Sequence, residues 1–194
     1  MNMIKTVIKD SIKLKELILN DEKLINSIQK ASDLIVECYK NKNKVLLCGN
    51  GGSAADAQHI ASELSGRFYL DRLSLPAEAM HVNTSYLTAV SNDYSFDMVY
   101  SRYLQGIGKD GDVLIGISTS GNSKNILQAL KQAKELNIST ISMTGKTGGK
   151  MKEFSDILIN IPSLDTPRIQ ESHILIGHII CEQVENRLFG KSPS

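Results

Sequence analysis

The sequence lacks an excess of charge of either sign. Its 194 residues include 22 lysine and arginine residues and 21 aspartate and glutamate residues, for a formal net charge of +1. No stretch of the chain collects charges of a single sign. Proteins that bind nucleic acid or a membrane surface usually carry such a basic cluster. The composition therefore argues against a nucleic-acid partner and against a membrane partner.

Long hydrophobic segments are also missing. No apolar run approaches the ~20 residues that a transmembrane helix needs. The first residues, Met1 to Lys5, begin a polar amphipathic stretch rather than the apolar core of a signal peptide. We therefore expect a cytoplasmic protein with a single domain over residues 1–194, which is long enough to form a full hydrophobic core.

Cysteine is scarce, odd in number and widely spaced, at positions Cys38, Cys48 and Cys181. Cys48 ends an apolar run, and Cys181 directly follows two isoleucines. We interpret the three cysteines as buried free thiols of a reducing cytoplasm, rather than as a disulfide, a metal site or a nucleophile.

The first 41 residues differ in pattern from the rest of the chain. Residues 3–19 place apolar side chains at helical spacing, and a second helix is expected to follow Asn20-Asp21 and end near Asn41. These two amphipathic helices precede a segment, 44–190, that could form a complete domain without them. We expect them to pack between subunits of an oligomer, although packing on the chain's own sheet fits the sequence nearly as well.

Short apolar runs alternate with helical segments after residue 44. The expected strands are Val45–Cys48, Ala79–Val82, Val113–Ile117, Thr140–Met143 and Ile157–Ile161. The expected helices are 53–65, 84–91, 96–107, 123–136 and a last long helix over Pro167–Leu188 with Thr166 as its cap. Strands that alternate with helices indicate a parallel sheet covered on both faces. The sequence therefore predicts an α/β three-layer sandwich around a parallel sheet of about five strands.

Two of these strands end in small polar loops that open helices. The first loop is Gly49-Asn50-Gly51-Gly52-Ser53, and the second is Ser118-Thr119-Ser120-Gly121-Asn122-Ser123. Ligands of parallel sheets bind at the carboxyl ends of the strands, and a free helix N-terminus favours an anion. Neither loop contains the Gly-Lys-Ser/Thr of a P-loop or the Gly-x-Gly-x-x-Gly of a dinucleotide site. A single such loop is more often a plain turn and cap, but two at one sheet edge indicate phosphosugar binding.

The helix after the first loop carries His59 and Glu63. Positions four residues apart lie about 40° apart around a helix and about 6 Å apart along it, so these side chains share a face. On the last helix, Gln170 and His178 lie about 80° and about 12 Å apart, and they meet at one site only if their side chains lean together. Two histidines, a glutamate and a glutamine form a set suited to zinc, with glutamine as the least common ligand. His173 points elsewhere, and we interpret it as a structural or surface residue.

Taken together, these residues resemble the sugar isomerase (SIS) domain family over nearly the whole chain. The resemblance rests on the two loops, on Asp56, His59 and Glu63, and on Arg168-Ile169-Gln170-Glu171 with His178. It implies the flavodoxin-like SIS fold. More narrowly, it implies the activity of those members that convert sedoheptulose 7-phosphate to D-glycero-D-manno-heptose 7-phosphate through an enediol, the first step toward ADP- or GDP-heptose for lipopolysaccharide or capsule.

The resemblance also implies roles for individual residues. Glu63 and His178 would be the catalytic acid–base pair, and one zinc ion per subunit would be bound in a homotetramer whose sites lie at subunit interfaces. The implied zinc ligands are His59, Glu63, Gln170 and His178. The implied substrate contacts are Asn50, Gly51, Gly52, Glu63, Asn92, Asp93, Ser118, Thr119, Ser120, Ser123 and Gln170.

Two alternatives stay open at this point. SIS domains also act without chemistry, as phosphosugar sensors or as proteins that associate with the bacterial replication initiator. Such relatives would not need the His/Glu/Gln/His set, so its presence favours an enzyme. The sequence does not measure the length of the sugar, so an isomerase of a pentose or hexose phosphate is the second alternative.

Overall fold

A computed structural model describes residues 2–190 of the chain, and these residues form an α/β structure around one sheet. Its five strands are all parallel and lie in the order β2-β1-β3-β4-β5. They are β1 (Val45–Gly49), β2 (Ala77–Ala79), β3 (Val113–Ser118), β4 (Ser139–Thr144) and β5 (Ile157–Asn160). The predicted parallel sheet is confirmed, and the strand order is that of flavodoxin-like folds.

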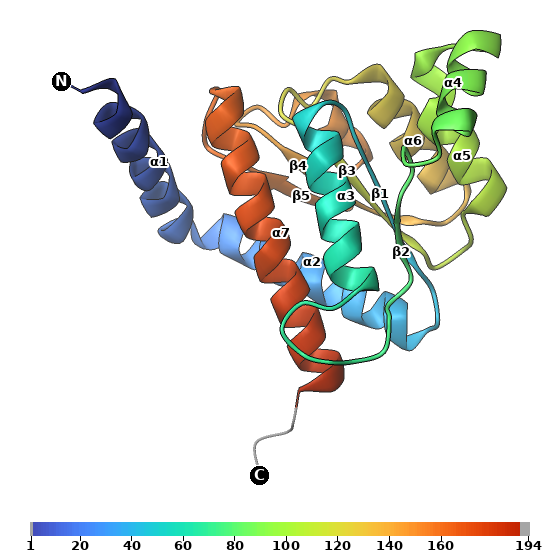
Figure 1. Ribbon diagram of the computed structural model, residues 1–194, viewed down its shortest axis with the longest axis horizontal. Coiled ribbons are helices and arrows are strands. Elements are labelled where there is room, and N and C mark those ends of the chain that lie inside the picture. The colour runs from blue at the N-terminus through green and yellow to red at the C-terminus, as the bar shows by residue number, and fades with distance from the viewer. Residues whose placement is uncertain (1, 191–194) are drawn as a thin grey trace.

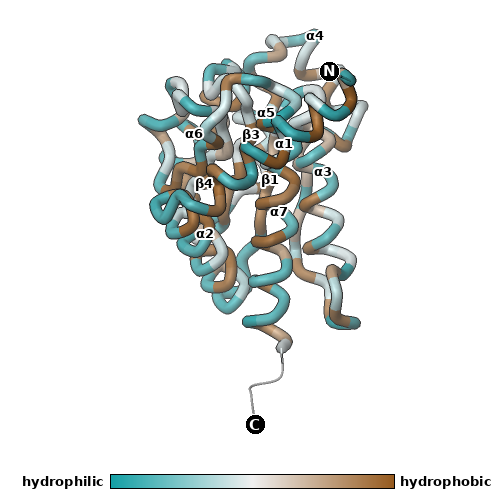
Figure 2. Tube along the Cα trace, turned by 90° about the vertical axis from the view of Figure 1, so that its left-hand side faces the viewer, coloured by the Kyte–Doolittle hydropathy of each residue, from teal (hydrophilic) through white to brown (hydrophobic). Residues whose placement is uncertain are grey.

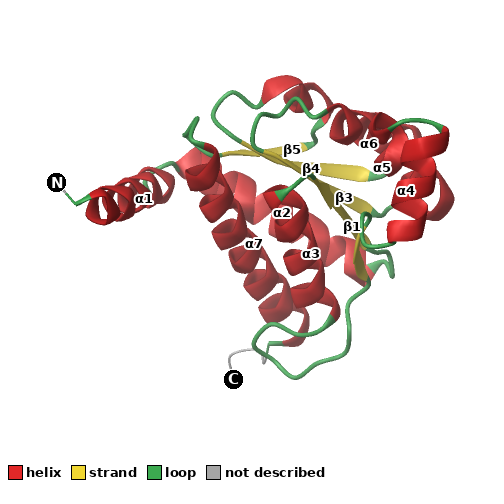
Figure 3. Ribbon diagram, turned by 45° about the horizontal axis from the view of Figure 1, so that its top comes forward, coloured by secondary structure: helices red, strands yellow, loops and turns green. Residues whose placement is uncertain are grey.

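Helices cover both faces of this sheet. They are α1 (Met3–Leu19), α2 (Glu22–Lys40), α3 (Gly52–Ser65), α4 (Thr84–Asp93), α5 (Val99–Ile107), α6 (Lys124–Glu135) and α7 (Thr166–Phe189), with short 3₁₀ turns at Phe96–Met98 and Gly149–Phe154. Figure 3 shows α2, α3 and α7 on one face of the sheet and α4, α5 and α6 on the other. The three layers that the sequence predicts are therefore present.

The central strands β1 and β3 are continuously apolar in sequence. Every residue of β1 and β3 is buried, as expected for strands that are covered on both faces. One core cluster lies between the sheet and α2, α3 and α7, and a second lies under α5 and α6. Figure 2 shows the hydrophobic segments gathered around β1, β4 and α7.

Two predicted boundaries are wrong. The second strand was expected over Ala79–Val82 but runs over Ala77–Ala79, because Ala77 pairs with Val45 and Ala79 with Leu47, and the chain turns after Met80. Thr166 is not the cap of the last helix but its first residue, and Asp165 precedes it in an extended conformation.

The two N-terminal helices differ in how they pack. Helix α2 buries residues such as Leu24, Ile28 and Ile35 in the core of its own domain. Helix α1 buries only Leu14 and Ile18, and Figure 1 shows it extending away from the body of the molecule. Most of its other apolar side chains are exposed to solvent: Met3, Ile4, Val7, Ile8, Ile12, Leu17 and Leu19. Any role of the N-terminal segment in assembly therefore falls mainly on α1.

The structure also bears on two exclusions made from the sequence. All three cysteines are buried free thiols, as predicted. Among residues 2–190, none of the helices combines the length and the apolar character needed to cross a membrane.

Candidate active site

A cleft lies where β1 and β3 end side by side at the carboxyl edge of the sheet. The strand order reverses at this point, because β2 adds to one side of β1 while the chain continues from β3 on the other. This is where ligands of such sheets bind. The glycine loop after β1 opens α3, and the serine loop after β3 opens α6. The predicted meeting of the two loops is thus confirmed.

The cleft has a volume of about 360 Å³. Its walls are the two loops together with the first turns of α3 and α7. The lining residues are Asn50, Gly51, Gly52, Ser53, Ile117, Ser118, Thr119, Ser120, Ser123, Thr166 and Gln170. Eight of these eleven were predicted as substrate contacts; Ser53, Ile117 and Thr166 were not predicted for this role.

The serine loop presents hydroxyl groups at the N-terminus of α6. Ser123 occupies the N-cap position, yet its side chain does not bond the helix N–H groups and instead lies 2.9 Å from the hydroxyl of Ser118. The hydroxyl of Ser118 is in turn 3.4 Å from that of Ser120. Unpaired N–H groups and the helix dipole favour a negative charge at such an end. The geometry suits a phosphate group.

The two loops are joined by a reciprocal amide pair. Asn50 Nδ2 donates to Asn125 Oδ1 and Asn125 Nδ2 donates to Asn50 Oδ1, both at 2.9 Å. Asn125 is buried at the start of α6, so the pair fixes the glycine loop against the helix that follows the serine loop.

The Gln170 side chain of α7 lies against the glycine loop. A Cβ added at Gly52 would be only 2.5 Å from Gln170 Nε2.

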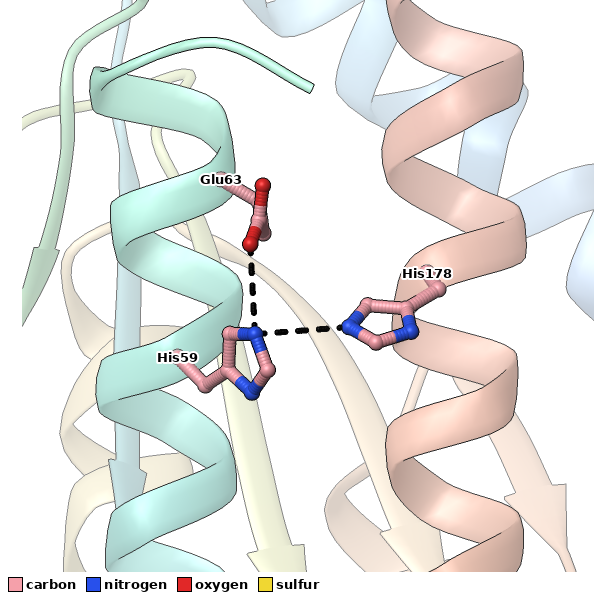
Figure 4. A group of neighbouring side chains, drawn as sticks. All are labelled: His59, Glu63 and His178. Atoms are coloured by element: carbon pink, nitrogen blue, oxygen red, sulfur yellow. Dashed lines mark hydrogen bonds and ion pairs between the residues drawn. The ribbon is translucent and has the colours of Figure 1, made fainter. Parts of the chain in front are cut away.

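Two helical turns along α3 from the cleft, His59, Glu63 and His178 form a cluster (Figure 4). His59 Nε2 lies 3.2 Å from Glu63 Oε1 and 3.4 Å from His178 Nε2. The two imidazole rings meet edge to face, with their centroids 4.9 Å apart. The predicted convergence of these three residues is therefore present within one chain.

The donor set of this cluster fits a zinc ion. Its three ligand atoms, two imidazole nitrogens and one carboxylate oxygen, lie within 4.8 Å of one another. A tetrahedral zinc ion bound at ~2.0–2.1 Å holds neighbouring ligand atoms roughly 3.3 Å apart. Two of the three spacings, from His59 Nε2 to Glu63 Oε1 at 3.2 Å and to His178 Nε2 at 3.4 Å, agree with that value.

Close approach of α3 and α7 brings the cluster together. Gly177 and Ile60 stand next to His178 and His59 in the sequence, and they face each other across the two helices. A Cβ at Gly177 would lie 2.5 Å from Ile60 Cδ1 and 2.7 Å from Ile60 Cγ1. The absence of a side chain at Gly177 thus lets the two helices pack at the distance that the imidazoles require.

Asp56 lies one turn before His59 on α3. Burial raises the pKa of the Asp56 carboxyl to about 6, although the nearby charge of His59 acts in the opposite direction. Among the described residues, its buried Oδ2 atom has no hydrogen-bond partner. The structure therefore places a second carboxyl group, with a raised pKa, within one turn of the cluster.

Four further residues considered in the sequence lie outside the cluster of His59, Glu63 and His178. Asn92 and Asp93 are exposed at the end of α4 and do not line the cleft. Gln170 lies beside Gly52 at the cleft, so its part in the predicted zinc set stays a prediction. His173 is fully buried, where its Nε2 lies 3.2 Å from the carbonyl oxygen of Thr144, and it is a structural residue as expected.

A buried pair beside the cluster, Arg72 and Glu185, was not predicted from the sequence. Their side chains are 2% and 1% exposed and 2.9 Å apart. Glu185 follows His178 by seven residues, which places both on nearly the same face of α7. That spacing was the available signal. Nothing in the loop sequence around Arg72 indicates that its side chain is buried.

Comparisons with known proteins identify the family of this chain. The family model of the SIS domain matches residues 13–145. The phosphoheptose isomerase of Clostridium acetobutylicum is 55% identical over 98% of this chain and 97% of its own length, and that of Sulfurimonas denitrificans is 54% identical over 96% of both. The chain belongs to the SIS-domain phosphoheptose isomerase family.

Solved structures of this family have the same fold. The phosphoheptose isomerase of Neisseria gonorrhoeae superimposes with a TM-score of 0.89 at 42% identity, over 94% of this chain and 97% of that one. The phosphoheptose isomerase of Francisella tularensis gives a TM-score of 0.91 at 36% identity, over 94% and 96% of the two chains.

Proposed function

We propose that this chain converts sedoheptulose 7-phosphate to D-glycero-D-manno-heptose 7-phosphate. The observation that carries the proposal is the cluster of Glu63, His59 and His178, which lies two helical turns from a loop suited to a phosphate. An isomerase of this kind needs a base for a carbon-bound proton, a group that moves protons between oxygens, and an anchor for the substrate. The names of the relatives support the same substrate class.

Glu63 is the base in this proposal. One of its oxygens faces His59, and Figure 4 shows the second directed away from that ring. Glu63 removes a proton from C1 of the ketose, which leaves an enediol between C1 and C2. The proton on the carboxyl group exchanges with water, and Glu63 then delivers a proton to C2. His178 moves the proton between the oxygens on C1 and C2, so that the carbonyl group passes from C2 to C1. Atoms and protons balance without an external oxidant.

The serine loop holds the phosphate end of the sugar. Ser118, Ser120 and Ser123 offer hydroxyl donors, and the N-terminus of α6 contributes its N–H groups. The cleft and the cluster are about 10 Å apart along α3, as seven residues of helix separate Gly52 from His59. A long, open-chain phosphosugar spans this separation.

His59, Glu63 and His178 would hold one zinc ion per subunit, with Gln170 as the predicted fourth ligand. When bound, zinc polarises carbonyl and hydroxyl oxygens as a Lewis acid. Binding to the ion lowers the basicity of Glu63, so its roles as ligand and as base compete. His59 makes no proton transfer in this scheme and serves to orient Glu63 and His178.

The homotetramer is supported by the exposed apolar face of α1. Ile4, Ile8 and Ile12 are 68%, 53% and 52% exposed and lie on a helix that extends from the body of the chain. Large exposed apolar patches mark surfaces that bind other proteins. The product would enter heptose synthesis for lipopolysaccharide or capsule in the cytoplasm.

Turnover tests the proposal directly. Purified protein should isomerise sedoheptulose 7-phosphate faster than pentose or hexose phosphates, and it should incorporate deuterium from heavy water at C2 of the product. The variant Glu63→Gln should lose about 10²–10⁴-fold in kcat, because it retains size but not basicity. Glu135→Gln, exposed at the end of α6, is the matched control. A Glu63→Gln variant as active as this control would overturn the enediol mechanism.

A further inference from the structure

The segment between α3 and β2, residues 66–76, forms no helix or strand, yet it is held in place by the buried pair of Arg72 and Glu185. Glu185 belongs to α7, two turns after His178. Its carboxylate accepts three backbone N–H groups, from Phe68 at 2.9 Å, Tyr69 at 2.6 Å and Leu70 at 2.8 Å. The fourth donor is Arg72 Nε at 2.9 Å. All the hydrogen-bonding capacity of this carboxylate is therefore directed at one segment.

The guanidinium group of Arg72 binds the end of α3. Its Nη2 donates to the carbonyl oxygen of Glu63 at 2.9 Å, and its Nη1 donates to those of Leu64 at 2.8 Å and Gly66 at 3.3 Å. These carbonyls lack partners within the helix, and a cation at this end also complements the helix dipole. The last turn of α3, which carries Glu63, is thereby fixed by a side chain outside the helix.

Each partner is connected to the catalytic cluster through one intervening contact. Arg72 holds the backbone of Glu63 directly. Glu185 holds the backbone of Phe68, whose ring centroid lies 5.6 Å from that of His178. The pair therefore binds the backbone of Glu63 and the backbone of Phe68, the residue whose ring lies against His178. The charged groups of Arg72 and Glu185 act on the cluster through these two residues.

We propose that Arg72 and Glu185 are positioning residues that hold Glu63 and His178 at the separation needed for proton transfer. The inference rests on the proposed isomerase function. A buried ion pair adds little net stability, since the cost of removing two charges from water offsets their attraction. A guanidinium group directs five N–H donors in one plane at several carbonyls and a carboxylate, whereas lysine has three donors on a single atom and apolar residues have none.

The first test separates kcat from KM. We expect Arg72→Lys and Glu185→Gln to lower kcat by about tenfold to a hundredfold, because displacement of catalytic groups by about 1 Å costs that much. The KM for sedoheptulose 7-phosphate should change by less than about threefold, as the phosphate cleft is two turns away. All assays are run well below the unfolding midpoint of each variant. Wild-type kcat in both folded variants would overturn the proposal, and so would an effect confined to KM.

The control is a second ion pair on the same helix. Arg187 of α7 pairs with Asp33 of α2, and both side chains are more than 40% exposed. Asp33→Asn should leave kcat unchanged. If it lowers kcat as much as Glu185→Gln, the effect is a general consequence of loosening α7, and the proposal fails.

A second readout does not depend on activity. The Phe68 ring should shift the ring-proton NMR signals of His178 in protein labelled with ¹³C-histidine, and Phe68→Leu identifies that shift by removing it. Glu185→Gln and Arg72→Lys should move the His178 signals toward their positions in Phe68→Leu, while Asp33→Asn should not. Unmoved signals in both variants would refute the positioning role. If the wild-type protein does not turn over the heptose phosphate, the proposed function fails while this measurement still decides the inference.

Discussion

The substitution Gly177→Ala should separate activity from stability. Gly177 faces Ile60 where α3 and α7 cross, and a new Cβ would lie 2.5 Å from Ile60 Cδ1. Carbon contacts become favourable near 3.5 Å, so the two helices or the Ile60 side chain must yield by about 1 Å. Ile60 is 1% exposed and has no solvent-filled space to enter. Some of the displacement is therefore transmitted to the neighbouring His59 and His178.

The expected magnitudes differ between the two properties. Overpacking lowers the free energy of unfolding by about 1–3 kcal/mol. Alanine in place of glycine within a helix raises it by about 1 kcal/mol. The net loss in the free energy of unfolding should then be about 0–2 kcal/mol. A displacement of about 1 Å at a catalytic group costs about a hundredfold in rate. Gly177→Ala should accordingly fold but have a greatly reduced kcat.

The assay compares four proteins by chemical denaturation and by steady-state isomerisation. The control is Gly106→Ala, on α5, where a Cβ would meet no atom within 4 Å. This variant should retain wild-type kcat and gain up to about 1 kcal/mol in stability. Ile60→Ala removes both Cδ1 and Cγ1, the two atoms that the new Cβ would meet, so combining it with Gly177→Ala should restore part of the lost activity. Wild-type kcat in Gly177→Ala, or no recovery in the double variant, would refute the link between helix packing and the site.

Four further predictions follow from other parts of the structure. Ser120→Ala and Ser123→Ala should each raise KM by about tenfold through a lost hydrogen bond to a charged phosphate, and unchanged KM values would remove the serine loop from the substrate site. Elemental analysis should find about one zinc per chain in the wild-type protein and none in His59→Ala, whereas retention of a full equivalent in the variant would exclude His59 as a ligand. Burial lowers the pKa of His173 to about 4, whereas the unfolded chain has the ordinary value of about 6.5. The unfolded state therefore takes up a proton first as the pH falls. The free energy of unfolding should drop by up to about 3 kcal/mol between pH 6.5 and pH 4 and should not depend on His173 above pH 6.5. Denaturation of His173→Gln should lack this pH-dependent part, and identical pH profiles would contradict the assignment. Ile8→Lys should break the predicted tetramer in light scattering, and an unchanged mass would show that this face of α1 is not part of the interface.

Local sequence patterns were sufficient to predict most of the elements. The continuous apolar runs of β1 and β3 reflect burial on both faces, and periodic apolar positions located α1 and α2 closely. The short edge strand β2 was misplaced because only three of its residues pair, and their register depends on β1 rather than on their own side chains. The cap of α7 was misassigned by one residue, because a threonine before a proline has the same local signature at the cap and at the first helical position.

The sequence by itself also determined the chemistry that this protein has available. The two polar loops follow buried strands, and a helix places His59 and Glu63 on one face, so a cleft between the loops and a His/Glu pair beside it were predictable from spacing. Tertiary structure alone decided that His178 completes this cluster while Gln170 lies beside Gly52, because residues on two different helices meet only at the distance set by helix packing. It also decided the burial of Arg72 and Glu185. A charged residue is buried only where partners from distant segments compensate the loss of water, and a linear sequence does not reveal those partners.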